Sequence, residues 1–480
     1  MNSPEESFSL VIFGATGNLA QLKLIPALYD LVEADLLPEN ISIIGIGRKD
    51  LSHQEFRDYS NQVLHKPNKH HQHPIKKEVA DKLLSKMLYV SGDIAEKGFY
   101  DKLNDLIKEE KSCSNRMFYL ATYPELYPTV FNLLQESGLN DQKCGYVRVI
   151  IEKPIGSDLP SAKKLNELLG QYYTEDQIFR LDHYLGRETL QNILSFRFAN
   201  NLFESMINKD HIDHIQVTAS EDFNIGMRGG YYDSVGALKD VGQNHILQMI
   251  ALATMEAPKS FTNHDVTTAR IKILEELKPD LNSVVFGQYQ GYLNEENVDT
   301  NSLSDTFFSF KAYIENERFA GVPIYVRAGK AMTRTVTEIA IIFKKNQPNL
   351  FANKEAADGN NVLIYRIQPN EGIVLKFLSK NPGTEFKLQN EYMQYCYKHT
   401  TDTLPDPYLR LLFDALRGDQ TFFVDAQEVE AQWRFTDPLI AKRNKLFSYQ
   451  QGSWGPKEVN QAIEKDGRKW LEPSVSFCAL

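Results

Sequence analysis

The sequence predicts an α/β domain built on a parallel sheet, followed by a larger α+β domain with a mainly antiparallel sheet. Over the first third of the chain, short apolar runs alternate with amphipathic helical stretches, which is typical of a parallel sheet covered on both faces. After residue 200, strand-like runs follow one another with few helices between them, which favours antiparallel pairing. With 480 residues and 42% hydrophobic content, the chain can bury more than one core. We place the domains at residues 1–182 and 183–480.

The expected elements of the first domain follow from run length and periodicity. The apolar runs of strand length are Ser9–Phe13, Ile41–Ile46, Lys86–Val90, Met117–Ala121 and Tyr146–Glu152. Helical stretches include Leu19–Glu33 and Lys97–Lys108. Pro26 is expected to kink or split the first of these helices, because proline lacks a backbone donor.

The second domain contains six expected strands and a closing helix. The strand-like runs are His214–Ser220, Phe307–Ile314, Glu338–Phe343, Val362–Ile367, Ile373–Leu378 and Tyr392–Tyr397. The helix is expected over Pro407–Arg417, with Gly418 just beyond its end as the residue that terminates it.

Composition excludes several classes of protein. A formal net charge of -10 disfavours a nucleic-acid binder, so any anionic ligand must be held by a local cluster of cations. No apolar run approaches the roughly 20 residues that span a membrane. The N-terminal residues are polar and acidic, unlike a signal peptide, so we expect a cytoplasmic protein. The four widely spaced cysteines (Cys113, Cys144, Cys396 and Cys478) are expected to be reduced thiols.

A glycine-rich turn after the first strand indicates a dinucleotide site and a Rossmann-type domain. Gly14 allows the tight turn, Gly17 lets the backbone approach a pyrophosphate, and helix N-terminal amides hold that anion. The spacing, Gly-x-x-Gly-x-x-Ala, departs from the usual fingerprint, so a tight turn without a ligand remains an alternative. The cofactor-binding residues expected here are Gly14, Ala15, Thr16, Gly17, Asn18 and Leu19.

The end of the second strand favours NADP over NAD. An NAD enzyme usually has an acidic residue there to bind the ribose hydroxyls, whereas this chain has Arg48, followed by Lys49. A guanidinium can pair with a 2′-phosphate through charge-assisted hydrogen bonds. The alternative is that Arg48 is a solvated turn residue.

Lysine and histidine candidates for the chemistry stand at a strand end and in a polar helix. Lys153 comes just before a proline at the end of a buried strand, where ligands of α/β sheets bind. His245 lies in a run dense in polar groups, DVGQNHILQM, and histidine is the natural base near neutral pH. On the sequence alone, a buried core histidine is the competing interpretation. The cluster His70, His71 and His73 lacks the spacing of metal ligands, and no metal site is expected.

Six sequence blocks follow one another over almost the whole chain. They are VIFGATGNLA, IIEKPIG, RLDHYLGRE, RGGYYDSVGALKDVGQNHILQM, VPIYVRAGKAM and YRIQPNEG. In this order they closely resemble glucose-6-phosphate dehydrogenase. The resemblance implies that His245 is the catalytic base, that Asp182 orients it, and that Lys153 touches both substrate and nicotinamide. It implies the substrate contacts Lys23, His183, Tyr184, Arg187, Glu221, Asp240 and Lys330, with Gln368 as an additional one. It also implies a cis Lys153–Pro154 bond.

Three positions differ from the family pattern. Asn18 stands where Asp is typical, and Arg187 stands where Lys is typical. Thr335 stands near the position of a second cation, with Arg334 beside it as a potential substitute. Because a planar guanidinium differs from an ammonium in reach and geometry, phosphate affinity and substrate choice are the properties most open to change.

The resemblance implies NADP-dependent oxidation of glucose 6-phosphate to 6-phosphogluconolactone, the first oxidative step of the pentose phosphate pathway. It also implies a homodimer or homotetramer. Two alternatives remain open from the sequence. One is a dehydrogenase of another sugar phosphate or of the free sugar, and the other is a catalytically silent regulatory paralogue that binds sugar phosphate or NADP.

Overall fold

The computed structural model describes residues 7–67, 74–110, 115–142, 145–345, 359–399, 404–474 and 476–478. These residues form two compact units. The first comprises residues 1–186 and 405–426, and the second comprises residues 187–404 and 427–480. The histidine cluster at His70, His71 and His73, together with Cys113 and Cys144, lies outside the described residues.

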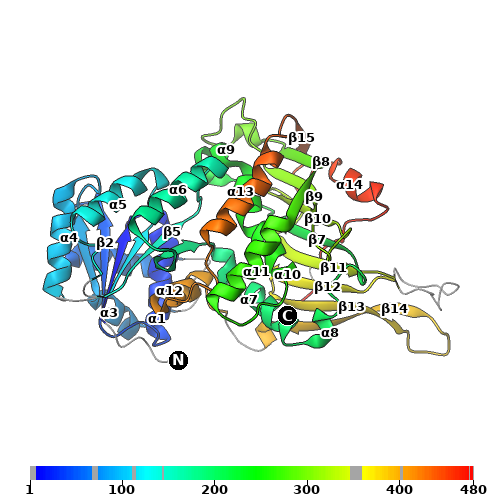
Figure 1. Ribbon diagram of the computed structural model, residues 1–480, viewed down its shortest axis with the longest axis horizontal. Coiled ribbons are helices and arrows are strands. Elements are labelled where there is room, and N and C mark those ends of the chain that lie inside the picture. Colours follow the sequence, from blue (N-terminus) through cyan, green and yellow to red (C-terminus); the bar gives the residue numbers. More distant parts are fainter. Residues whose placement is uncertain are drawn as a thin grey trace. The chain divides into compact units, whose positions relative to one another are not determined.

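The first unit is a doubly wound parallel sheet with helices on both faces (Figure 1). Its six strands run in the order β3-β2-β1-β4-β5-β6, and every pairing is parallel. This is the Rossmann order, so the predicted fold class of this part is confirmed. The strands are β1 (Phe8–Phe13), β2 (Ile41–Gly47), β3 (Met87–Ser91), β4 (Asn115–Leu120), β5 (Val147–Glu152) and β6 (Ile178–Leu181).

Helices and turns connect these strands. They are η1 (Ala20–Leu24), α1 (Ile25–Glu33), α2 (His53–Leu64), α3 (Lys77–Ser85), α4 (Lys97–Glu110), η2 (Pro124–Leu126), α5 (Tyr127–Glu136), α6 (Leu159–Tyr172), η3 (Glu175–Gln177) and η4 (His183–Gly186). The predicted first helix is a π-helical turn, η1, that continues into α1. Pro26 lies in the first turn of α1, directly after the change from π-helical to α-helical geometry. Its missing donor interrupts the hydrogen-bond pattern of the helix at this point.

Helix α12 (Pro407–Arg417) belongs to the first unit although it is distant in sequence. The predicted bounds are confirmed, and Gly418 follows in a left-handed conformation with φ of 81°. Arg148 of β5 donates from Nη1 to the carbonyls of Ala415 and Leu416 at 2.8 and 2.9 Å. A cation at a helix C-terminus satisfies the free carbonyls, so this contact fixes α12 against the parallel sheet.

The second unit contains a nine-stranded, mostly antiparallel sheet in the order β14-β13-β12-β11-β7-β10-β9-β8-β15. Only the β7–β10 and β8–β15 pairs are parallel, so the predicted α+β class is confirmed. The strands are β7 (Ile212–Ser220), β8 (Leu277–Tyr289), β9 (Phe307–Ile314), β10 (Ile324–Gly329), β11 (Val336–Phe343), β12 (Val362–Gln368), β13 (Gly372–Lys380), β14 (Leu388–Cys396) and β15 (Leu446–Tyr449).

The helices of the second unit are gathered over its sheet (Figure 1). They are α7 (Glu188–Phe198), α8 (Asn201–Glu204), η5 (Gly226–Arg228), α9 (Gly229–Ala237), η6 (Leu238–Ile246), α10 (Leu247–Thr254), α11 (Asn263–Glu276), η7 (Tyr292–Asn294), η8 (Tyr397–His399), α13 (Ala426–Ile440) and α14 (Val459–Lys465). Of these, α10 packs on both α7 and α11, and α7 also packs on β12.

The expectation of reduced thiols is wrong for two of the four cysteines. Cys396, at the end of β14, forms a disulfide with Cys478, and their Cα atoms are 5.3 Å apart. The two residues are 82 positions apart in sequence, so their spacing gives no indication of the pairing. They meet because the C-terminal segment passes along β13 and β14, where Cys478 donates its backbone N–H to Gln394.

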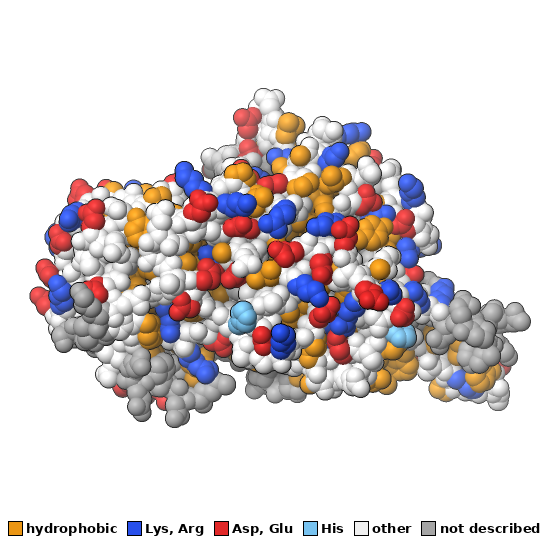
Figure 2. Space-filling view, in the orientation of Figure 1, with side chains coloured by type: hydrophobic (Ala, Val, Ile, Leu, Met, Phe, Trp, Pro, Cys, Tyr) orange, Lys and Arg blue, Asp and Glu red, His pale blue; other side chains and the backbone are white. Residues whose placement is uncertain are grey.

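The surface carries mixed charge. On the face drawn in Figure 2, acidic and basic side chains are interspersed and form no patch of one sign. Anion binding on this chain therefore depends on local clusters of cations. Within the described residues, no helix is both long enough and apolar enough to cross a lipid bilayer.

Candidate active site

The predicted glycine turn lies at the carboxyl end of β1. Gly14 has φ of +85°, and a Cβ placed on it would lie 2.5 Å from the carbonyl oxygen of Ala121, which follows β4. Only glycine fits this position. The amides of Gly14 and Ala15 donate to the carbonyl of Ile46 at 3.0 and 2.9 Å, which fixes the turn against β2. Strand order reverses between β1 and β4, and ligands of open α/β sheets bind at this point.

The residues after this turn fit a dinucleotide. Gly17 and Asn18 are exposed where the helical turn begins, so their backbone can approach a ligand. The carbonyl of Thr16 accepts from Tyr59 and from Gln21, both at 3.1 Å, which holds the loop in place. An N-terminal helical turn with accessible amides is suited to a pyrophosphate.

No acidic residue stands in β2 or in the two positions that follow it. Arg48 and Lys49 are exposed directly after β2, and the Nζ of Lys49 lies 5.6 Å from the ring centre of Tyr59. The carboxylate of Asp50 accepts a hydrogen bond from Ser91 at 3.0 Å. This strand end therefore offers cations, and its one nearby carboxylate is bonded to β3.

Lys153 and Glu152 stand at the carboxyl end of β5. The Lys153–Pro154 bond is cis, as the resemblance implied. Glu152 accepts a hydrogen bond from the hydroxyl of Tyr119 at 2.5 Å, and a second comes from Tyr408 of α12. Burial raises the pKa of Glu152 to about 7, against the lowering effect of the two tyrosine hydroxyls. Sequence reasoning missed this carboxyl group, because its partners come from β4 and α12.

Glu152 is expected to make the stability of the protein depend on pH. Its pKa is raised from 4.5 to about 7 on folding, so the folded state holds a proton that the unfolded chain has lost between these values. The contribution of this proton to the free energy of unfolding is fully present below about pH 4.5 and is lost as the pH rises through about 7. We expect the melting temperature of Glu152→Gln, minus that of the parent, to increase between about pH 5 and about pH 8.

A control for this measurement is Glu78→Gln, because Glu78 is exposed on α3. Its difference from the parent is expected to stay constant over the same pH range, as solvated surface groups contribute little. A difference for Glu152→Gln that stays constant or falls with pH would contradict the expectation.

The end of β6 presents Asp182 and His183. Asp182 is buried and accepts from the backbone N–H of Tyr184 at 2.9 Å, which caps the turn η4. The ring of His183 stacks on that of Tyr408, with centres 6.1 Å apart and planes 15° apart. Lys23 also lies over the ring of Tyr408, with its Nζ 5.4 Å from the ring centre. Tyr408 thus joins Lys23 and His183, two of the predicted substrate residues.

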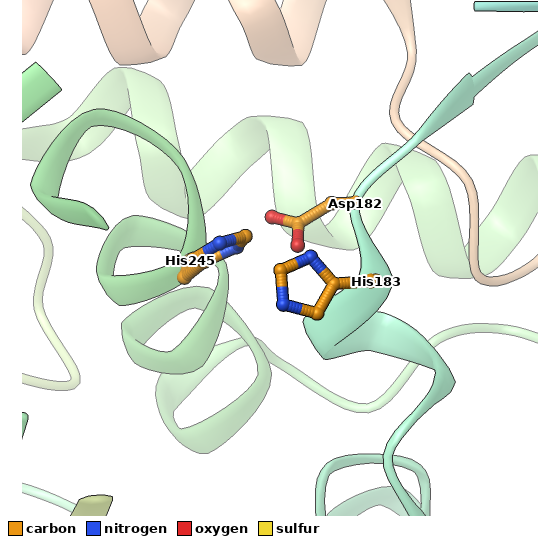
Figure 3. A group of neighbouring side chains, drawn as sticks. All are labelled: Asp182, His183 and His245. Atoms are coloured by element: carbon orange, nitrogen blue, oxygen red, sulfur yellow. The ribbon is translucent and has the colours of Figure 1, made fainter. Parts of the chain in front are cut away.

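His245 and Asp240 lie on the π-helix η6. Both side chains are buried, with exposed fractions of 2% and 6%. π-Helical turns are rare in proteins, and those that occur often lie at functional sites. Figure 3 shows the side chain of His245 on this helix, and those of Asp182 and His183 where β6 runs into η4. The guanidinium of Arg228 lies 3.9 Å from the carboxylate of Asp240.

Asp305 fixes the start of η6. The backbone N–H of Leu238 donates to its carboxylate at 2.8 Å, and Arg443 donates to the other oxygen at 2.6 Å. Gly236 has φ of +74°, and a Cβ there would lie 2.5 Å from the Asp305 carboxylate. This close approach orients the helix that carries His245, and sequence reasoning missed it because Asp305 lies in a loop between β8 and β9.

Glu221 and Lys330 form an ion pair at the ends of two parallel strands. β7 and β10 pair in parallel and end opposite each other, at Ser220 and Gly329. Glu221 directly follows β7, and Lys330 directly follows β10. Their side chains are in hydrogen-bond contact. This arrangement places a carboxylate and an ammonium together, as a ligand with both hydroxyl and phosphate groups requires.

Arg187 and Gln368 lie at the start of α7 and at the end of β12. The guanidinium of Arg187 lies 3.4 Å from a carboxylate oxygen of Glu371. Of the positions that depart from the family pattern, Thr335 donates to Asp222 at 2.5 Å, and Arg334 donates to the carbonyl of Pro473 at 3.0 Å. Arg334 is therefore bonded to the C-terminal segment.

Family models match both parts of the chain. The model described as glucose-6-phosphate dehydrogenase, NAD binding domain, matches residues 11–192. The model described as glucose-6-phosphate dehydrogenase, C-terminal domain, matches residues 194–471. The chain belongs to the glucose-6-phosphate dehydrogenase family.

Relatives within the glucose-6-phosphate dehydrogenase family match over the full length. A glucose-6-phosphate 1-dehydrogenase of Aggregatibacter actinomycetemcomitans is 38% identical, over 98% of this chain and 98% of its own. One of Rhizobium meliloti (strain 1021) is 39% identical, over 97% and 98%. A solved glucose-6-phosphate dehydrogenase in complex with its substrate glucose-6-phosphate is 34% identical, with a TM-score of 0.90 over 98% of this chain and 100% of its own.

Proposed function

We propose that this protein oxidises D-glucose 6-phosphate to 6-phospho-D-glucono-1,5-lactone with NADP, as the first oxidative step of the pentose phosphate pathway. The observation that carries the proposal is the match to both domains of one dehydrogenase family over the length of the chain. The residues expected to carry out the reaction are all present. NADP supplies a hydride acceptor for C1 of the sugar.

His245 is proposed as the base that takes the proton from the C1 hydroxyl group. A buried imidazole on a fixed helix suits this task, since a general base needs a defined position and a pKa near neutrality. Asp182 is proposed to accept from the other ring nitrogen and to stabilise the imidazolium that forms. Because Asp182 caps η4 with one oxygen, its carboxylate is already fixed in orientation.

Cations and carboxylates are proposed to divide the recognition of the sugar phosphate. Cations and hydrogen-bond donors suit the phosphate, and carboxylates suit the sugar hydroxyls. The residues proposed for the phosphate end are Lys23, His183, Tyr184, Arg187 and Lys330, and those for the hydroxyls are Glu221, Asp240 and Gln368. The stacking of His183 on Tyr408 and the position of Lys23 over the same ring support two members of this set.

The turn from Gly14 to Leu19 is proposed to hold the cofactor's pyrophosphate. The amides of Gly14, Ala15 and Gly17 already donate to backbone carbonyls of β2 and of the turn itself. The amides of Thr16, Asn18 and Leu19 are therefore proposed as the donors to the pyrophosphate. Arg48 is proposed to pair with the 2′-phosphate of NADP. Lys153 is proposed to contact both cofactor and substrate from the end of β5.

Steady-state turnover tests the proposed function. Purified protein is offered glucose 6-phosphate, other hexose phosphates and free glucose, each with NADP and with NAD, and the absorbance of reduced nicotinamide is followed. Turnover with glucose 6-phosphate and NADP supports the proposal, and no turnover with any pair would favour the silent paralogue. Asp182, His183 and His245 are also residue types that bind zinc, so a chelator arm is included. Activity is expected to resist chelation, because a metal on the imidazole nitrogen would block the base.

Arg48→Ala is expected to raise the KM for NADP by about tenfold and to leave the KM for NAD within about twofold. Only NADP carries the phosphate with which the guanidinium pairs. Lys66→Ala is a suitable control, since Lys66 is also an exposed cation of the first unit. Equal effects of Arg48→Ala on both cofactors would contradict the assigned role.

We propose residues 1–182 as the cofactor-binding domain and 183–480 as the domain for substrate binding and dimerisation, although residues 183–186 and 405–426 pack in the first compact unit. A homodimer or homotetramer is supported by exposed apolar side chains on the edge strand β14: Tyr392, Met393 and Tyr395 have exposed fractions of 43%, 61% and 47%. Apolar groups on a sheet edge favour association. Light scattering of the purified protein tests this, and a monomer would contradict it.

A cytoplasmic location is proposed because phosphorylated sugars and NADP are charged metabolites that do not cross membranes unaided. The disulfide between Cys396 and Cys478 argues in the other direction, since structural disulfides favour oxidising compartments. Alkylation of free thiols in intact cells, followed by mass spectrometry of the two cysteines, tests the proposal. Full oxidation of this pair in every cell would count against a cytoplasmic location.

A further inference from the structure

The start of α7 is completed by a carboxylate from a distant loop. Arg187 stands at the N-cap position in extended conformation, and its own side chain makes no capping bond. Glu371, between β12 and β13, supplies the acceptor in its place. Its Oε2 accepts from the backbone N–H of Thr189 at 3.2 Å and lies 3.1 Å from the Thr189 hydroxyl. Helix N-termini favour a negative charge, so the carboxylate is stabilised where it stands.

The other oxygen of the same carboxylate faces Arg187. The Nη1 of Arg187 donates to Oε1 of Glu371 at 3.4 Å. Arg187 is about one-fifth exposed, and Glu371 is 15% exposed. A single carboxylate therefore contacts both the helix start and the guanidinium that departs from the family pattern.

The loop that carries Glu371 is itself fixed. The backbone carbonyl of Glu371 accepts a hydrogen bond from the backbone N–H of Tyr397 at 3.4 Å. A Cβ on the next residue, Gly372, would lie 2.5 Å from the carbonyl of Tyr395, so the backbone packs against β14 without space for a side chain. The same loop begins directly after Gln368, the last residue of β12, which is proposed to contact the substrate. The Glu371 carboxylate is thus a fixed point against which a long side chain can be oriented.

Only an arginine can use this arrangement fully. A guanidinium has five donors on a planar fork, so a bond to a carboxylate on one edge leaves other donors for a phosphate. A lysine ammonium is a compact charge on a flexible stem and lacks this two-sided geometry. Arginine side chains lose rotamer entropy when they are fixed, and a contact made before binding removes part of that cost.

We propose that Glu371 is a positioning residue for Arg187, and that the pair sets the affinity for the phosphate group of the substrate. The proposal rests on the phosphate-binding role of Arg187 proposed above. Glu371 also brings a negative charge towards the phosphate, which opposes binding. Both of its oxygens already accept hydrogen bonds, so this charge is largely compensated, and we expect the positioning effect to dominate.

Glu371→Gln tests the proposal, because it keeps the size of the side chain and removes the charge. We expect the KM for glucose 6-phosphate to rise about fivefold while kcat stays within about twofold. The inhibition constant of inorganic phosphate, competed against glucose 6-phosphate, is expected to rise by about the same factor. A purely structural role would lower stability and kcat without a selective effect on phosphate.

The matched control is Thr189→Val. It removes the hydroxyl that contacts the same carboxylate and keeps both the backbone bond and the Arg187 contact. It is expected to lower the melting temperature and to leave the KM for glucose 6-phosphate and the phosphate inhibition constant unchanged. A rise in both constants comparable to that of Glu371→Gln would overturn the proposal.

The Arg187→Ala variant separates the phosphate-binding role of Arg187 from the positioning role of Glu371. If Arg187→Ala leaves the KM for glucose 6-phosphate unchanged, the phosphate-binding role of Arg187 is wrong. If Arg187→Ala raises this KM, Glu371→Gln is expected to add nothing further in that background, because the two residues act as one unit. Full additivity of the two substitutions, or no effect of Glu371→Gln alone, would overturn the positioning role of Glu371.

Discussion

His245→Asn is expected to lower kcat for glucose 6-phosphate oxidation by about 10⁴-fold, with little change in KM. Asparagine is polar and can hydrogen-bond, but it cannot take a proton near neutral pH. His245 is only 2% exposed and lies within the π-helix η6, so a side chain of similar polarity should be accommodated. The measurement is steady-state turnover, with circular dichroism to establish that the variant is folded.

Asp182→Asn is expected to lower kcat by a smaller factor, about 10²-fold. The amide oxygen can still accept from Tyr184, so η4 remains capped, while the charge that would stabilise the imidazolium is lost. If Asp182 only stabilises the turn, the asparagine variant should retain its full kcat.

His214 provides the control for both variants. It is also a buried histidine beside an aspartate, with its Nδ1 2.5 Å from Asp213. Its Nε2 lies 2.8 Å from the side-chain nitrogen of Gln216, so both of its ring nitrogens are used within the second unit. His214→Asn is expected to lower stability and to leave kcat within about twofold. Equal losses of kcat in His214→Asn and His245→Asn would contradict the assignment of the base.

The sequence predicted those parts of the fold where local pattern and final environment agree. The strands β1, β2 and β5 are fully or mostly buried apolar runs, and their environment repeats what their sequence indicates. β8 was not predicted, because its sequence, LKPDLNSVVFGQY, contains Pro279 and several polar residues that disfavour strands. It forms because β9 pairs along it, with an irregularity between Asp280 and Val285. Pairing with a distant strand is not visible in local pattern.

The candidate site divides in the same way. Gly14 is required by its own backbone conformation, so a motif of a few residues predicts the turn correctly. The contacts of His183 with Tyr408 and of Arg187 with Glu371 join residues 225 and 184 positions apart. Such supporting contacts depend on tertiary packing, and no short sequence spacing indicates them.

Glu428→Ala is expected to destabilise the second unit by about 3–5 kcal/mol, because it leaves a buried charge without its partner. Glu428 and Arg270 are both 0% exposed, and their side chains meet at 2.8 and 3.1 Å. Gln248 of α10 donates to the same carboxylate at 3.1 Å. Helix α10 continues η6, so this network supports the helix that carries His245.

Calorimetric melting of three further variants separates charge from packing in this network. Lys272 lies on the same helix as Arg270 and forms a half-exposed ion pair with Glu256. Lys272→Ala is expected to lower the free energy of unfolding by less than about 1 kcal/mol. The double variant Arg270→Met with Glu428→Met is expected to lie much closer to the parent than Glu428→Ala, since neither buried charge remains. The stability of Glu428→Gln should fall between that of the double variant and that of Glu428→Ala, because an amide still accepts from Arg270 but no longer balances its charge. If Glu428→Ala costs no more than Lys272→Ala, the guanidinium of Arg270 must reach solvent or another anion when its partner is lost, and the network does not support α10.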